Sequence, residues 1–204
     1  MAAEGDALPG RTLEGHPHAD DRSPAERLAA NRLGLWLFIA SESFLFAAVI
    51  SARYYLLGTE VPEELSRPLG MVISVVLLSS SLFAFRAETA AAFGDRRGFV
   101  RNTQATILMG VVFMGGVVLE WREGLELFPP STLYGSVFFT LIGLHAFHVF
   151  TGVLALAALL YVGREGRFCS RETHWPVEGV VKYWHFVDVA WVFIFPTLYL
   201  VGGS

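Results

Sequence analysis

The chain has 204 residues, of which 53% are hydrophobic and only 17% are charged, and its mean hydropathy is +0.49. A soluble globular domain carries about a quarter charged residues, so this composition excludes an ordinary soluble domain and indicates a membrane protein. The net charge of -4 gives no indication of a nucleic-acid partner, and the single cysteine, Cys169, excludes an intramolecular disulfide and a cysteine-ligated cluster.

The first segment, residues 1–26, is polar and rich in Gly, Pro, Ala and His. A signal peptide needs an apolar core, which this segment lacks, so we expect a disordered cytoplasmic tail. His16 and His18 lie in this tail. We expect no metal site there, because a short histidine pair in a polar tail usually arises by chance.

Five apolar runs follow the tail, each bounded by polar or turn-forming residues. A helix of about 20 residues crosses the hydrocarbon core of a bilayer, and every run reaches that length. The sequence therefore predicts an all-α polytopic membrane protein, with a five-helix transmembrane bundle in residues 27–204. The connections are short, so we expect consecutive helices to be antiparallel neighbours. The runs cover about 33–57, 69–92, 102–121, 132–162 and 180–201.

The positively charged residues predict the orientation of the bundle, because cytoplasmic loops retain Lys and Arg. Ten arginines precede the first run or flank the second and fourth connections, and only Arg53, Arg67 and Arg122 lie on the other side. We therefore expect the N-terminus in the cytoplasm and the C-terminus outside. The cytoplasmic set is Arg22, Arg27, Arg32, Arg86, Arg96, Arg97, Arg101, Arg164, Arg167 and Arg171.

Several ionisable residues lie inside the apolar runs, where they are costly and usually functional. Glu42 lies about 15 Å into the first run at 1.5 Å per residue, close to the midplane. His145 and His148 are i, i+3 neighbours in the fourth run, and His185 and Asp188 have the same spacing in the fifth. From their depths we expect these five residues to cluster in the inner half of the bundle.

The fifth run also carries two tryptophans. Trp184, Asp188 and Trp191 follow i, i+4, i+7 spacing and share one helix face, which we expect to pack against protein rather than lipid. We group Glu120 with the two tryptophans as a candidate helix-packing motif. Glu120 lies at the outer end of the third run, where we expect water to reach it.

The candidate residues could bind a metal or haem, handle protons, or cross-link the helices by hydrogen bonds. Histidines and carboxylates suit a transition metal, but bundle di-metal sites use Glu-x-x-His pairs, and no run contains one. His145 and His185 are the candidate axial ligands of a haem, without a recurrent pattern to support them. Proton handling and helix cross-linking by hydrogen bonds both remain. We expect no metal, no cofactor and no catalytic residue in this chain.

Four stretches of the sequence carry a family resemblance. They are LGLWLFIASESFLF in the first run, Leu119-Glu120-Trp121 at the end of the third, GLHAFHVFTGV in the fourth and YWHFVDVAWVFIF in the fifth. These stretches resemble subunit III of the haem-copper oxidases, the cytochrome c and quinol oxidases, over about residues 31–201. Glu42 is similar to the family's buried helix glutamate, His145 and His148 to its His-x-x-His pair, and Trp184, His185 and Asp188 to its C-terminal motif.

The resemblance implies an accessory subunit of a proton-translocating terminal oxidase, bound to the catalytic subunit I, which carries the haems and copper, and to subunit II. In this family, subunit III supports proton delivery, binds phospholipid and protects the active site from inactivation during turnover. The chain lacks the two N-terminal helices of seven-helix members. Five helices are usual in bacterial members, which implies a multi-pass protein of a bacterial inner membrane.

Two alternative functions stay open. One is an accessory or activation protein of nitric oxide reductase, which shares the subunit III fold. The other is a free-standing proton-coupled transporter, although transporters commonly show internal repeats with broken helices, and this sequence shows no such repeat. The electron donor, cytochrome c or quinol, binds to another subunit, so this sequence leaves both donors open.

Overall fold

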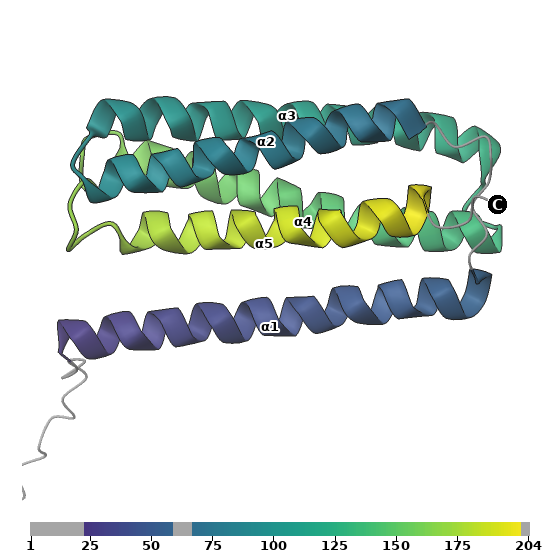
Figure 1. Ribbon diagram of the computed structural model, residues 1–204, viewed down its shortest axis with the longest axis horizontal. Helices are drawn as coiled ribbons and strands as arrows, with labels where there is room; N and C mark the ends of the chain where they lie inside the picture. Colours follow the sequence, from purple (N-terminus) through teal and green to yellow (C-terminus); the bar gives the residue numbers. More distant parts are fainter. Residues whose placement is uncertain (1–22, 59–66, 201–204) are drawn as a thin grey trace, which may run out of the picture.

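The structure is a computed structural model that describes residues 23–58 and 67–200. Within these residues it contains helices and no strand, which confirms the all-α prediction. The helices lie side by side along one common direction, with their connections at the two ends (Figure 1). They are α1 (Pro24–Leu57), α2 (Arg67–Ala92), α3 (Arg96–Leu127), α4 (Leu133–Gly163) and α5 (Trp175–Tyr199).

Some helices are longer than the apolar runs that predicted them. α1 begins at Pro24, because the Ser23 hydroxyl accepts from the Glu26 N–H and the Glu26 carboxylate accepts from the Ser23 N–H at 2.7 Å. This capping box and the proline in the first turn begin a helix where the apolar pattern indicated tail. The rest of the predicted tail, with His16 and His18, lies outside the described residues.

Four helices, α1 to α4, are long and apolar enough to cross a membrane by length and composition. α5 has 25 residues and runs beside them (Figure 1), and it carries the ionisable residues Glu178, Lys182, His185 and Asp188. α5 packs against α1, α2 and α4, so its polar side chains find partners on other helices.

The helices are not all packed against their neighbours in sequence. α2 packs on α3, α3 on α4 and α4 on α5, but α1 packs on α4 and α5. The expectation that all consecutive helices are neighbours was therefore wrong for α1 and α2. α2 lies beside α5 instead, where the indole N–H groups of Trp184 and Trp191 donate to Ser80 Oγ at 2.9 Å and Ser74 Oγ at 2.7 Å.

Trp184 and Trp191 lie in the core of the bundle and are fully buried. A Cβ atom at Gly110 of α3 would lie 2.7 Å from the Trp184 ring, and one at Gly152 of α4 would lie 2.8 Å from it. Only glycine leaves room for the indole at both positions. Trp191 meets the Phe113 ring edge-on, with 5.0 Å between centroids. The tryptophan face of α5 thus lies inside the bundle.

Glu120 is only 4% exposed, so the expectation that water reaches it was wrong. α3 continues about two turns beyond this residue, to Leu127, and therefore does not end where the apolar run ends. Tyr199 of α5 lies over the carboxyl group and donates its hydroxyl to Glu120 Oε2 at 2.9 Å.

α1 is the least buried helix. Only 6% of its most apolar stretch is buried, against 39% in α3 and in α4, and its buried residues are Phe46 and Arg53. Polar contacts spaced along its length hold it to the other helices. These are Arg32–Glu178 at 3.0 Å, Glu42–His148 at 3.1 Å and Tyr54–Thr197 at 3.4 Å.

Candidate functional site

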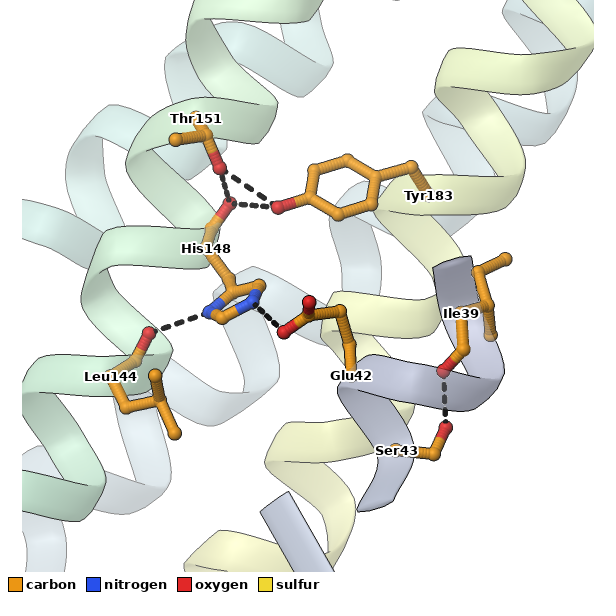
Figure 2. A network of polar contacts seen from close by, with 7 residues as sticks. All are labelled: Ile39, Glu42, Ser43, Leu144, His148, Thr151 and Tyr183. Atoms are coloured by element: carbon orange, nitrogen blue, oxygen red, sulfur yellow. Dashed lines mark hydrogen bonds and ion pairs between the residues drawn. The ribbon is translucent and has the colours of Figure 1, made fainter. Parts of the chain in front are cut away.

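Glu42 of α1 and His148 of α4 meet between their helices (Figure 2). His148 Nε2 lies 3.1 Å from Glu42 Oε2, and His148 Nδ1 lies 2.8 Å from the carbonyl oxygen of Leu144. The side chain of Glu42 is 20% exposed and that of His148 is 6% exposed. The two groups are thus largely enclosed and in direct contact.

The contact with Leu144 defines where His148 carries its hydrogen. A backbone carbonyl only accepts, so Nδ1 of His148 is protonated. Nε2 then faces Glu42 either with a lone pair, in which case Glu42 is a carboxylic acid that donates, or with a second hydrogen, in which case the two groups form an ion pair. Both forms hold one shared proton and are neutral overall, and a neutral pair is the less costly state inside hydrocarbon.

An open groove of about 490 Å³ lies beside this pair, between α1 and α4. Its walls are mainly apolar, with Phe38, Leu45 and Phe147 among the lining residues. Tyr183 of α5 also lines it, and the tyrosine hydroxyl lies 2.8 Å from Thr151 Oγ1 (Figure 2). The groove therefore presents a carboxyl group and an imidazole in otherwise apolar surroundings.

A second polar site joins α5 to α2. Ser81 Oγ lies 2.7 Å from His185 Nδ1 and donates to Asp188 Oδ2 at 2.6 Å. Asp188 is 3% exposed, and its other carboxyl oxygen, Oδ1, has no hydrogen-bond partner among the described residues. Ser81 was missed in the sequence. The signal that points to it is the run of serines at 79–81 inside an apolar helix, where hydroxyl groups need partners.

His145 belongs to neither site. It is completely buried, and neither ring nitrogen has a hydrogen-bond partner within the described part of the chain. Its neighbours are aromatic: the ring centroids of Trp191 and Phe113 lie 4.8 Å and 5.7 Å away. The imidazole of His145 therefore packs as an aromatic ring.

The depths of the five ionisable candidates predicted that they cluster in the inner half of the bundle. Their contacts divide them into three groups. Glu42 pairs with His148, His185 and Asp188 meet through Ser81, and His145 lies among aromatic rings. Within residues 23–58 and 67–200, no three His, Cys, Asp or Glu side chains are grouped as metal ligands would be. That this chain has no metal, cofactor or catalytic centre stays a prediction.

The fold and these sites define a multi-pass helical membrane protein with ionisable groups between its helices. The chain belongs to the cytochrome c oxidase subunit III family, whose model matches residues 25–203.

Relatives of both oxidase types are similar to this chain. Cytochrome c oxidase subunit 3 of Synechocystis sp. is 33% identical over 201 residues, which cover 95% of this chain and 81% of the relative. The protein of the same name from Corynebacterium diphtheriae is 34% identical, covering 89% and 96%. Quinol oxidase subunit 3 of Bacillus subtilis is 30% identical, covering 93% and 98%. Membership of the family places the chain in respiratory electron transport.

Proposed function

We propose that this chain is the accessory subunit III of a bacterial haem-copper terminal oxidase. The observation that carries this proposal is the family match over residues 25–203. The named relatives are subunits of cytochrome c and quinol oxidases, which favours an oxidase over a nitric oxide reductase as the partner complex. Catalysis, haems and copper then belong to subunit I, and this chain binds subunits I and II.

The experiment that tests this proposal is purification of the tagged chain from its native membrane in a gentle detergent. The expected result is co-purification of a haem-copper catalytic subunit, seen by mass spectrometry and by the visible spectrum of its haems. The haem type and the oxidised donor would then identify the complex as a cytochrome c or a quinol oxidase. A colourless chain that arrives alone, from a membrane with intact partners, would contradict the proposal and favour an assembly factor or a transporter.

The proposal includes five crossings of the plasma membrane, with the N-terminus in the cytoplasm and the C-terminus outside. α5 runs beside the four helices that are long and apolar enough to cross a membrane, which supports a fifth crossing (Figure 1). The α2–α3 turn and the α4–α5 connection lie at the same end of the bundle, where Arg96 Nε donates to the carbonyl of Arg164. Arginines are concentrated at this end, as expected of a cytoplasmic face.

The single cysteine tests this orientation. Cys169 lies in the α4–α5 connection, and burial raises the pKa of its thiol, so labelling is done at about pH 8, where more thiolate is present. We expect a membrane-impermeant maleimide to label Cys169 in inverted vesicles but not in intact cells. The matched control is a Cys169→Ser, Ser131→Cys variant, whose thiol lies in the exposed α3–α4 connection and is expected to show the opposite pattern. Labelling of Cys169 from outside would contradict the orientation.

We assign the Glu42–His148 pair a role in proton supply to, and stability of, the catalytic subunit. Three features support this role: the two groups are in contact at 3.1 Å, they lie on helices long and apolar enough to cross a membrane, and they border an open groove. The apolar lining of that groove suits the acyl chain of a bound phospholipid. Because α1 has little other buried surface, the pair also helps to hold α1 to α4.

A further inference from the structure

We propose that Ser81, His185 and Asp188 form a second proton-binding site, in which the serine hydroxyl relays one proton between the imidazole and the carboxyl group. The proposal concerns this chain's own groups and does not depend on the identity of the partner complex. It stands on the contacts of Ser81 Oγ, which lies 2.7 Å from His185 Nδ1 and 2.6 Å from Asp188 Oδ2.

The donors and acceptors in these contacts indicate where the hydrogens lie before the site binds a proton. Ser81 has one hydroxyl hydrogen and donates it to Asp188 Oδ2, so its oxygen accepts from His185. In the proposed starting state His185 is neutral, with its hydrogen on Nδ1, and Asp188 is a carboxylate. The chain of hydrogen bonds runs from His185 Nδ1–H to Ser81 Oγ–H and on to Asp188 Oδ2, and it leaves His185 Nε2 with a free lone pair.

A proton that arrives at His185 Nε2 can pass through this chain with every bond balanced. The Nδ1 hydrogen moves to Ser81 Oγ, and the Ser81 hydrogen moves to Asp188 Oδ2. The product is a neutral His185 with its hydrogen on Nε2, an unchanged serine and a carboxylic acid at Asp188. The site has gained one proton and lost one negative charge, and the hydrogen bonds now point the opposite way.

Burial favours the protonated form. Asp188 is 3% exposed, and its Oδ1 atom accepts no hydrogen bond from the described residues, so a carboxylate there lacks half of its usual partners. His185 is partly exposed whereas Asp188 is buried, so in the proposed relay the proton enters at His185.

Other ionisable groups on the surrounding helices are engaged elsewhere or more distant. On α1 and α4, Glu42 and His148 pair with each other, and His145 lies against Trp191. On α5 itself, Lys182, one turn before His185, binds the Glu178 carboxylate, and the Tyr183 hydroxyl lies against Thr151 of α4. On α2, Glu88 lies about two turns further along the helix than Ser81. The relay therefore depends on its own three residues.

The test uses the chain in its native complex, purified after labelling of histidine with ¹⁵N. Nuclear magnetic resonance distinguishes the Nδ1–H from the Nε2–H form of His185, and infrared spectroscopy reports the C=O stretch of a protonated Asp188. As the pH falls, we expect the change of His185 tautomer and the gain of the Asp188 band to share one midpoint. D188N is expected to lose the band and the tautomer change, and H185Q identifies the histidine signal.

Substitutions at Ser81 and Ser79 test whether the Ser81 hydroxyl transfers the proton, or whether His185 and Asp188 titrate together only because they lie close to each other. Ser81→Ala is expected to abolish the shared midpoint, whereas Ser81→Thr, which keeps the hydroxyl, retains it. The matched control is Ser79→Ala, since Ser79 makes no side-chain hydrogen bond in the described structure. A shared midpoint that persists in S81A would overturn the proposal. So would a doubly protonated His185 beside an ionised Asp188, or no titration of either group.

Discussion

The two polar sites place an imidazole and a carboxyl group together in different ways. In the α1–α4 site Glu42 and His148 touch directly at 3.1 Å, beside an open groove. In the α2–α5 site Ser81 stands between His185 and Asp188, and the carboxyl group is nearly inaccessible. Direct contact keeps one proton within a neutral pair, whereas the interposed hydroxyl lets a proton move between two groups that do not touch.

The surrounding helices account for this difference. α1 lies at the edge of the bundle, so the Glu42–His148 pair serves both to attach a helix and to line a groove. α5 is enclosed by α1, α2 and α4, and its site is bordered by the tightly packed Trp184. The first site is therefore expected to tolerate changes in packing better than the second.

The largest effect is expected from filling the space occupied by Trp184, beside the α2–α5 site. In Gly110→Val the new Cβ would lie 2.7 Å from the indole and 2.8 Å from Val153, which is closer than packed atoms allow. We expect a loss of about 3 kcal/mol of stability and poor assembly. Gly115→Val is the control, since no atom lies within 4 Å of a Cβ there. Equal thermal midpoints of the two variants in mild detergent would contradict this packing.

The two histidines of α4 should respond in opposite ways to the same substitution. His148→Leu removes the partner of Glu42 and is expected to cost about 2 kcal/mol. His145→Leu removes a buried ring whose nitrogens are unpartnered in the described structure, so stability should stay the same or rise by about 1 kcal/mol. Thermal unfolding of the purified complex measures both. A greater loss in H145L than in H148L would show that the assignment of the pair is wrong.

A smaller effect tests whether the two sites are independent. Glu42→Gln and His148→Gln, alone and together, should give a coupling of about 1 kcal/mol, which is typical of hydrogen bonds between membrane helices. Glu42→Gln with Asp188→Asn should be additive within about 0.5 kcal/mol, because the two residues share no partner in the described part of the chain. A strong coupling between Glu42 and Asp188 would mean that the two sites are not independent.

The sequence was sufficient for the helices and for most of the ionisable residues, because both depend on local pattern. Its errors come from contacts between distant segments. Ser81 was missed because short connections indicated that α1 and α2 are neighbours, whereas α2 lies beside α5. The burial of Glu120 was missed because the polar end of α3 remains helical and Tyr199 covers the carboxyl group. The capping box at Ser23 is visible in the sequence but lies outside the apolar run, so the start of α1 was predicted too late.

The most direct measurement compares the assembled oxidase with and without Glu42→Gln. The glutamine amide can still donate to His148 Nε2, so we expect normal assembly, but it can no longer exchange a proton. We predict a lower proton yield or a several-fold shorter lifetime before inactivation during turnover. Ser43→Ala is the control, because among the described residues Ser43 bonds only to the Ile39 carbonyl of its own helix. An unchanged rate, proton yield and lifetime in E42Q would contradict the role of the pair.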